Sequence, residues 1–506
     1  MEQTNLINST YRKNISSIQN NVSTLFTNEN SVVKILCSRA KSVITSYEAL
    51  NGELKFNGEV CFSVLFINEN NEFITLKETE KFSGRIEDEK ITVNFIPVFS
   101  SDVIELKTSF SGDEIRVNGV VETVIEGIIS ESINYYVSNN DNIITNSNFI
   151  NYSSLDSNGQ LNFNFAESFD CKDKINKVLF AGANAQICDY SLGSDYFTAE
   201  GIISVNFGFE TGEEVKEIKQ FTKSYRFKEE LEKEGITKEG YLVLKTNIFD
   251  CDIKTEIIEK DGENTVNFEI PVLVDYVYLK PNTSEVVVDA YSLTNKLNLN
   301  IESFTVDSKN FTKCIEEKID GQLIINDEAP RIIKIISYCG DDVSITNTIK
   351  DNDCVIVEGV ASVNVIYLEE GEESERLNSV IVEVPFSVEN PIDLNANDDV
   401  TSSAIIKDVD VKSRKGKEIN IDMELCIKID VFATTEEMAL TSVQEGEVLT
   451  PKEACLQIYF ARKGNTLWDI SKGLVCRPEQ ILKQNPNINL PLNEDEKIVL
   501  FEGRDN

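Results

Sequence analysis

The chain has 506 residues, of which 41% are hydrophobic, and its 86 acidic against 48 basic residues give a formal net charge of −38. A chain of this length exceeds a single hydrophobic core, so we expect several domains, each with enough apolar residues to fold. The acidic balance argues against nucleic acid and anionic lipid as partners, because both carry the same sign of charge.

Two residue types limit the chemistry further. The chain has no histidine, which excludes Ser-His and Cys-His nucleophile pairs and histidine metal ligands. Its 11 cysteines include no Cys-x-x-Cys motif, and Cys61, Cys354 and Cys426 occupy apolar strand positions, where a free cysteine acts as a small hydrophobe. We therefore expect unpaired cysteines in a reducing compartment, with no metal site and no cofactor.

The N-terminal residues, from Met1 onward, show neither a basic segment nor an apolar run. No segment reaches the ~18 to 20 apolar residues that a membrane helix needs. We expect a soluble cytoplasmic protein without membrane insertion. Residues 1–30 are rich in Asn, Ser and Thr, and we assign them as an N-terminal arm. This arm is either an extended segment or strand added to the first domain, or a segment that binds a partner.

Three segments of the chain share one strand pattern. Each centres on a glycine that is followed, eight positions later, by an aromatic residue: Gly58 and Phe66, Gly201 and Phe209, Gly359 and Tyr367. The residues four and six positions after each glycine are apolar. This period of two places side chains on one face of a strand. A Lys-[Ile/Val]-[Leu/Ile] triplet precedes each glycine and a phenylalanine follows it at similar spacings, which indicates three divergent copies of one domain.

Strand patterns fill these copies and helical patterns are few. The clearest strands are 54–66, 197–209, 357–367 and 417–432, while short helical turns are expected at the Lys triplets and a short helix at 227–233. We predict a mainly β fold with three tandem β-sandwich-like repeats at 31–150, 170–325 and 327–440. A linker at 441–454 then leads to a C-terminal domain at 455–506.

The C-terminal domain has a different pattern. A strand pattern ends before Gly464, Thr466 can cap a first helix, and Pro478 suits the first position of a second helix. Residues 497–501 form a closing strand. This order predicts a small β-α-α-β domain.

This domain resembles a LysM module, through the segments Gly464-Asn-Thr-Leu-Trp-Asp-Ile-Ser and Asn485-Pro-Asn-Ile. Asn465 stands where aspartate is commoner. The resemblance implies that ligand or partner binding involves two loops, with the residues Gly464, Asn465, Thr466, Leu467, Trp468, Asn487 and Ile488. Trp468, the single tryptophan, has an alternative role in packing between the first helix and the sheet of the module.

Three β-rich repeats ahead of one LysM module resemble the SPOCS-domain spore coat proteins of Clostridia, a SipL-like family. The resemblance implies a scaffold in the mother cell, at the forespore surface or spore coat, whose LysM docks the coat morphogenetic ATPase (SpoIVA-like) or another coat protein. The alternative is binding of a peptidoglycan or chitin-type glycan that contains N-acetylglucosamine. Phosphate-binding loops, dinucleotide fingerprints and zinc-protease motifs are missing from the sequence. We therefore expect no enzyme and no catalytic residue.

Overall fold

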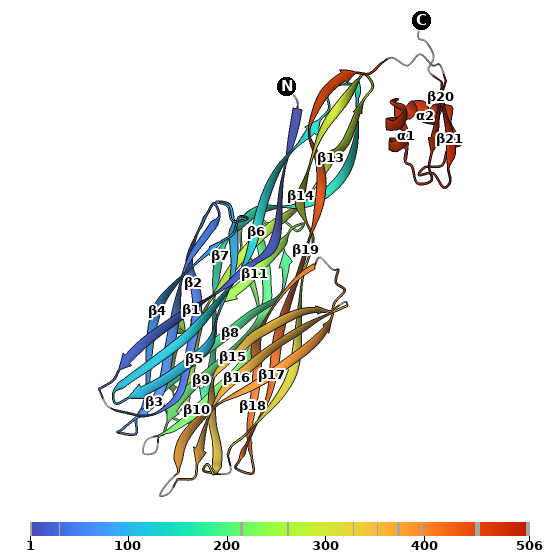
Figure 1. The fold of residues 1–506 in the computed structure, drawn as a ribbon. Helices are drawn as coiled ribbons and strands as arrows, with labels where there is room; N and C mark the ends of the chain where they lie inside the picture. Colours follow the sequence, from blue (N-terminus) through green and yellow to red (C-terminus); the bar gives the residue numbers. More distant parts are fainter. Residues whose placement is uncertain are drawn as a thin grey trace.

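The computed structural model describes residues 3–29, 31–212, 216–260, 263–326, 328–351, 353–371, 375–395, 398–450 and 456–501. As the sequence predicts, the fold is mainly β. In the described ranges, helices are confined to α1 (Leu467–Leu474), α2 (Pro478–Gln484) and the single turn η1 (Asp250–Asp252). None of these has the length and apolar character that crossing a bilayer requires. Figure 1 shows an elongated body of strands with a small unit beside its upper end.

The first unit of the body consists of two antiparallel sheets on one core. One sheet has the order β2–β3–β4 and the other β1–β6–β5. Apolar side chains from both sheets, such as Phe56, Phe62 and Ile125, are fully buried between them. The strand bounds are β1 (Gln3–Thr27), β2 (Val32–Leu50), β3 (Glu53–Asn68), β4 (Phe73–Glu87), β5 (Ile96–Ser111) and β6 (Glu114–Val137).

The second unit has the same strand order, with one interruption. Its sheets are β8–β9–β10 and a second sheet in which β13 pairs with β7 on one side and with β11 and β12 on the other. The turn η1 thus divides one edge strand into two pieces. The strand bounds are β7 (Ile143–Cys171), β8 (Ile175–Leu192), β9 (Tyr196–Thr211), β10 (Glu217–Glu232), β11 (Tyr241–Asn247), β12 (Lys254–Lys260) and β13 (Glu263–Ser292).

The third unit repeats the order of the first. Its sheets are β15–β16–β17 and β14–β19–β18, so that in all three units the first strand pairs with the last. The core between the sheets is lined by β-branched residues such as Val357, Val363 and Ile421. The strand bounds are β14 (Asn295–Ile324), β15 (Ile332–Asp351), β16 (Cys354–Glu369), β17 (Arg376–Pro391), β18 (Asp398–Arg414) and β19 (Glu418–Val448).

The glycine and phenylalanine of the sequence pattern are partners across neighbouring strands. The register pairs them directly in each unit: Gly58 with Phe82, Gly201 with Phe227, and Gly359 with Phe386. A Cβ placed on Gly359 would lie only 2.6 Å from the Phe386 ring. The ring therefore covers the glycine, and the same close packing contact occurs in all three units.

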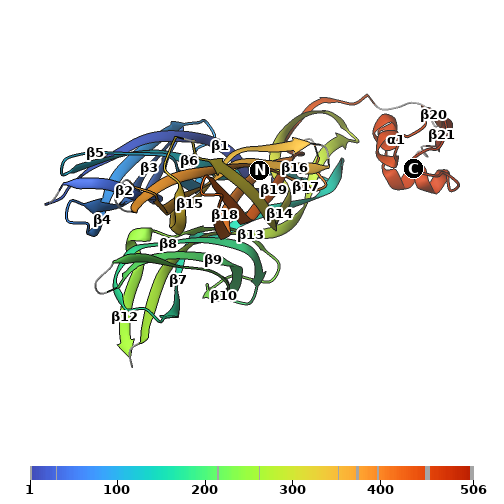
Figure 2. The same ribbon diagram turned by 90° about the horizontal axis from the view of Figure 1, so that it is seen from below.

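Three long ribbons extend beyond the cores and pack into a stem. Each ribbon is formed by the first and last strand of one unit, namely β1 with β6, β7 with β13 and β14 with β19. Their buried side chains form a shared cluster, which includes Ile7, Ile133, Ile150, Val286, Phe304 and Ala439. Figure 1 shows the stem rising from the body, and in Figure 2 the stem projects to the right, away from the three units.

The segments expected to be helical in this body are strands. Lys34, Lys177 and Lys334 lie in β2, β8 and β15, and residues 227–232 lie in β10. Register shifts flank all three Lys triplets, for example between Val32 and Lys34. Such bulges break the period of two, which explains why these strands resemble helical turns in the sequence. Asn30 and Asp327, which start two of the expected turns, lie outside the described residues.

Several expected boundaries also differ from the structure. Residues 3–27 form β1, which pairs with β6 along its whole length, so the expected alternative of a strand added to the first domain is confirmed and these residues belong to the first unit. The Asn-rich residues 138–148 predict a surface loop or linker, but residues 143–148 belong to β7. Residues 295–324, assigned to the second repeat, form β14, whose partner is β19 of the third unit. The expected linker begins at 441, whereas β19 continues to Val448, and residues 451–454 lie outside the described ranges.

The cysteines also depart from the expectation. Cys61 forms a disulfide with Cys251 and Cys37 forms one with Cys339. The first bond joins β3 to η1 in the second unit, and the other joins β2 to β15 in the third unit. Cys426 is buried, as its apolar position predicts. The two disulfides therefore connect the first unit to each of the others.

Candidate functional site

The C-terminal unit has the β-α-α-β order that the sequence predicts. Strand β20 (Leu456–Ala461) pairs antiparallel with β21 (Glu496–Phe501), and α1 and α2 lie between them in the chain. A small core holds the unit together, with buried side chains from each element: Ala461, Ile470, Leu474, Cys476, Ile481, Leu492, Ile498 and Leu500. Cys455 and residues 502–506 of the expected domain lie outside the described residues.

Residues at the start of α1 satisfy its free backbone groups. Thr466 Oγ1 accepts a hydrogen bond from the Asp469 amide at 3.3 Å, and the Thr466 amide donates to Asp469 Oδ2 at 2.8 Å. This reciprocal pair is a capping box, which stabilises the start of a helix. Helix α2 starts with Pro478 at its first position. The predicted cap and the predicted proline start are both present.

The first predicted binding loop, residues 464–467, is joined to the loop that precedes β21. The Gly464 amide donates to the Leu492 carbonyl at 2.8 Å, and the Leu492 amide donates to the Asn465 carbonyl at 3.0 Å. Gly464 is exposed and has a φ of 88°, a conformation that favours glycine. The amides of Gly464, Asn465 and Thr466 therefore all have partners within the protein.

The second predicted loop contains residues of two kinds. Asn487 is exposed, whereas Ile488 packs against the core of the unit. The sequence reasoning did not assign a role to Asn485, whose side chain donates to the carbonyls of Ile481 and Val499 at 3.0 Å each. Asn485 therefore fixes this loop to α2 and β21. An asparagine directly after a helix was the available signal.

Trp468 lies neither in the small core nor on a free surface. Its Nε1 donates to Asp289 Oδ2 of β13 at 2.9 Å, and its ring centroid lies 5.1 Å from that of Tyr291. Lys472, one turn further along α1, donates to both oxygens of Asp289 at 2.6 and 2.7 Å. The predicted packing of Trp468 between the helix and the sheet of its own unit is wrong, because α1 turns this residue toward the stem.

Two further contacts connect the unit to the stem tip. The Tyr291 hydroxyl donates to the Cys476 carbonyl at 2.5 Å, and Arg477 donates to the Asp141 carbonyl at 2.8 Å. A register shift after Val287 in β13 places Val288 as an extra residue just before Asp289. The tip of the stem thus supplies charged and aromatic side chains that contact the C-terminal unit.

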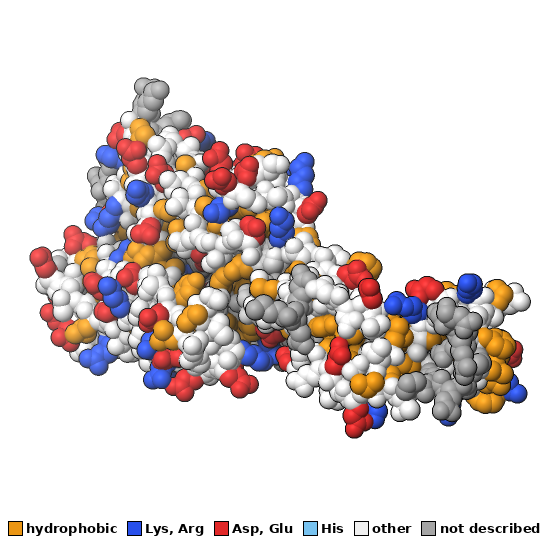
Figure 3. All heavy atoms as spheres, turned by 90° about the horizontal axis from the view of Figure 1, so that it is seen from above, with side chains coloured by type: hydrophobic (Ala, Val, Ile, Leu, Met, Phe, Trp, Pro, Cys, Tyr) orange, Lys and Arg blue, Asp and Glu red, His pale blue; other side chains and the backbone are white. Residues whose placement is uncertain are grey.

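The strands of the C-terminal unit face away from the stem and expose apolar side chains. Figures 1 and 2 place β20 and β21 on the far side of α1, and Figure 3 shows apolar side chains gathered at this end of the molecule. We call this surface the outer face, and it consists of Leu456, Ile458, Phe460 and Phe501, which are 47%, 52%, 69% and 62% exposed. The signal in the sequence was a strand with apolar residues at both odd and even positions.

A second group of charged residues lies where the stem meets the body. Arg12 of β1 is buried, its Nε donates to Glu126 Oε2 at 2.6 Å, and its guanidinium lies 3.5 Å from Asp430. Lys428 and Lys245 lie 3.4 Å from Asp430 and 3.8 Å from Glu126. Burial alone would raise the pKa of Glu126, but Arg12 and Lys245 outweigh it and lower that pKa. These paired charges come from all three units and hold them together.

A cavity of about 590 Å³ adjoins this charge cluster. Its wall includes Lys41, Asp102, Asn184 and Thr401, which come from all three units. Burial lowers the pKa of Lys245, which also lines it. The sequence could not reveal this group, because its members are distributed over the whole chain.

A family model matches part of the third unit. Residues 331–414 match the family model described as SipL, SPOCS domain. These residues cover β15, β16, β17 and β18 of the third unit. No curated protein and no solved structure was found to match the chain. The part of the chain from 331 to 414 is therefore similar to the SPOCS domain of SipL.

Proposed function

We propose that this chain is a non-enzymatic scaffold of spore coat assembly. It acts in the cytoplasm of the mother cell, at the forespore surface, and docks a coat protein through its C-terminal unit. The observation that carries this proposal is the match of residues 331–414 to the SPOCS domain of SipL. The recurrence of the same strand order in all three units supports the reading of the body as three SPOCS-type β-sandwich repeats.

We assign the C-terminal unit as a LysM domain. Its β-α-α-β order, its capped first helix and its Asn485 bridge support this assignment. The unit sits at the tip of a stem and contacts the body through α1. This position suits an adaptor, because the side of the unit opposite α1 faces away from the rest of the chain.

The outer face is the surface we assign to the coat protein partner, the SpoIVA-like ATPase or another coat protein. Burial of one phenylalanine stabilises a complex by about 1.5 to 3 kcal/mol. We therefore assign the two exposed phenylalanines of this face, Phe460 and Phe501, as the anchors of the contact with the partner. Lys497, whose Nζ lies 5.5 Å from the centre of the Phe460 ring, adds one cationic group for an acidic neighbour.

Glycan binding by the two predicted loops is the second function we consider, and the structure gives it less support. A bound N-acetylated sugar needs free hydrogen-bonding groups on the loops. The amides of Gly464, Asn465 and Thr466 are engaged by Leu492, Arg462 and Asp469. This arrangement leaves mainly side chains, such as that of Asn487, for a sugar.

Capture of the partner from sporulating cells tests the proposal. The full chain should co-purify the coat ATPase or another coat protein, and the double variant Phe460→Ser with Phe501→Ser should capture at least ~10-fold less, since both phenylalanine anchors are lost. Phe149→Ser is the matched control, because Phe149 is 78% exposed but lies on β7 of the stem. It should capture as much partner as the unchanged chain.

Two results would contradict this function. If the folded double variant captures coat proteins as well as the Phe149→Ser control, the outer face is not the docking surface. If instead the chain binds peptidoglycan or chitin fragments saturably and captures no coat protein, the glycan alternative replaces the scaffold proposal.

A further inference from the structure

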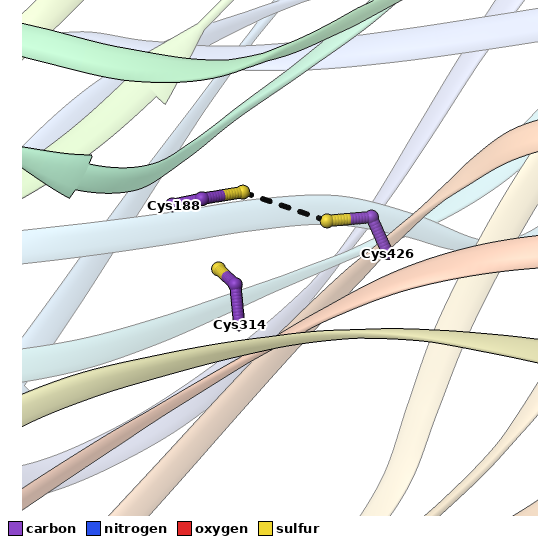
Figure 4. Close-up of side chains that lie close together, drawn as sticks. All are labelled: Cys188, Cys314 and Cys426. Carbon is purple, nitrogen blue, oxygen red and sulfur yellow. Dashed lines mark hydrogen bonds between the residues drawn. The ribbon is translucent and has the colours of Figure 1, made fainter.

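Three cysteines from distant parts of the chain meet where the second and third units touch. Cys188 lies in β8, Cys314 in β14 and Cys426 in β19, and 238 positions separate the first from the last. Figure 4 shows their three sulfur atoms directed toward a common point. All three Sγ atoms lie within 4.8 Å of one another, and those of Cys188 and Cys426 are 3.6 Å apart.

The β14–β19 ladder fixes two of these cysteines. Cys314 pairs with Lys428 across the ladder, and Glu316 pairs with Cys426. Because side chains two positions apart share a face, Cys314 and Cys426 are diagonal neighbours on the same side of the sheet. Strand β8 of the second unit supplies Cys188 from above this face. The site therefore exists only when the two units are docked.

The sulfur spacing fits a metal ion and not a disulfide. Bonded sulfurs lie ~2.05 Å apart, much closer than those of Cys188 and Cys426. Sulfurs that each lie ~2.3 Å from a tetrahedral zinc ion are about 3.8 Å apart. Thiolate ligands select soft ions such as zinc. We propose that Cys188, Cys314 and Cys426 bind one zinc(II) ion as a site that joins the second unit to the third.

The neighbouring residues complete this site. Gln186 Nε2 donates to the Cys426 carbonyl at 3.3 Å and lies 3.8 Å from the Cys426 sulfur, which is the position of a group that orients a ligand. Three thiolates around Zn²⁺ carry a net charge of −1, and the buried Lys428, which also pairs with Asp430, lies opposite Cys314 as a nearby positive charge. Gln186 and Lys428 thus support the site without binding the zinc ion.

The fourth position of the zinc ion is assigned to water. Glu316 is the nearest carboxylate along the ladder, but it is held by Arg226 at 2.7 Å and by Lys407 at 2.5 Å. The chain has no histidine that could take its place. Cys188 and Cys314 are only partly buried, which gives a metal ion access to the sulfurs.

Binding would exchange protons for the metal and stabilise the docked units. Zinc displaces the protons of the three thiols, which pass to the solvent, and no electron transfer takes place. Since the ligands come from two units, the ion binds the docked arrangement and not the separated one. Its binding free energy then adds to the stability of that interface by mass action.

The test uses the full chain with its two disulfides intact, purified without reductant and freed of metal with a chelator. Zinc chloride is added, remaining thiols are alkylated with iodoacetamide, and the modified cysteines are identified by peptide mass mapping. We expect zinc to protect Cys188, Cys314 and Cys426, while Cys171 and Cys354, which lie outside the cluster, are modified equally with and without zinc. Equal modification of all five cysteines in both samples would overturn the proposal.

Variants give a second measurement. Loss of an orienting neighbour typically weakens metal binding 10- to 100-fold, so loss of the ligand in Cys314→Ser should weaken zinc affinity by more than about 100-fold. Cys354→Ser is the matched control and should bind zinc as the unchanged chain does. Circular dichroism establishes that both variants fold. A disulfide between Cys188 and Cys426 in the freshly purified chain, with Cys171 and Cys354 still thiols, would also overturn the zinc assignment.

Discussion

The indole Nε1 of Trp468 donates a hydrogen bond to Asp289 Oδ2 over 2.9 Å, which joins the C-terminal unit to the strand β13 of the stem. Lys472 binds the same carboxylate, so a single residue of the stem holds two side chains of α1. The sequence predicts a separate domain after a linker. In the structure, specific contacts fix this domain to the stem.

Asp289→Ala should release Trp468 into water. Trp468 is the only tryptophan, so the intrinsic fluorescence of the chain reports on this one contact. We expect the emission maximum to shift to longer wavelength and acrylamide quenching to increase, because the indole loses its acceptor. Glu285→Ala, an exposed change on the same strand, should leave the spectrum unchanged. An Asp289→Ala spectrum identical to that of the unchanged chain would mean that other contacts hold the unit.

Gly359→Ala should destabilise the third unit. The new Cβ would lie 2.6 Å from the Phe386 ring and 2.5 Å from the Ser344 carbonyl, and the carbonyl belongs to the backbone and cannot rotate away. We expect a loss of about 1 to 3 kcal/mol in the free energy of unfolding, measured with urea. Gly119→Ala is the control, because its nearest contact is 3.2 Å from a side chain, and it should cost less. Equal costs would argue against a special role for the glycine and phenylalanine pair.

Arg12→Met should be among the most damaging single changes in the body. It leaves the buried carboxylates of Glu126 and Asp430 without their shared guanidinium, although Lys245 and Lys428 remain. Breaking a buried ion pair from one side costs about 3 to 5 kcal/mol. The exposed Arg116→Met on β6 should change stability by no more than about 0.5 kcal/mol in the same urea experiment. A comparable effect of both changes would contradict a joining role for the cluster.

Asp307→Asn should stabilise the chain at neutral and higher pH. Burial raises the pKa of Asp307 to about 6, although it accepts hydrogen bonds from Tyr241 and Ser153. Because this pKa lies above the ordinary value of 3.8, its stabilising contribution is complete below about pH 4 and is lost as the pH rises through about 6. Asparagine resembles the protonated form, so we expect a gain of about 1 to 2 kcal/mol near pH 8, allowing for partial exposure.

The pH series supplies its own control. Near pH 4 the unchanged chain and Asp307→Asn should have the same free energy of unfolding, because the carboxyl is then mostly protonated in the folded state. A stability difference that stays constant across the series would show that ionisation of Asp307 is not its cause.

The sequence predicted the strands best where alternation runs without interruption. Residues 357–367 lie within β16 and residues 418–432 within β19, as their apolar pattern indicates. The Lys triplets were misread because bulges beside them shift the pattern by one residue. In the C-terminal unit, the cap at Thr466 and the start at Pro478 were readable, since both depend on neighbours within three positions.

Contacts between distant segments were beyond the sequence. No local pattern pairs β14 with β19, so residues 295–324 were assigned to the wrong repeat. The same limit applies to Asp289, which lies 179 positions before Trp468, and to the three clustered cysteines. The outer face was missed for a different reason. The sequence predicts a strand that ends before Gly464 but does not show that β20 starts at Leu456, so that Leu456, Ile458 and Phe460 share the side opposite Tyr459 and Ala461.

The three ribbons of the stem also determine how the chain would transmit mechanical force. The last strand of the body, β19, runs to the tip beside β14, with pairs extending from Ile324 and Glu418 to Asn295 and Val448. A pull on the C-terminal unit along the stem therefore loads this ladder in shear, so that many hydrogen bonds resist together and none is peeled alone. A tether attached at this end can bear tension without unravelling the units beneath it.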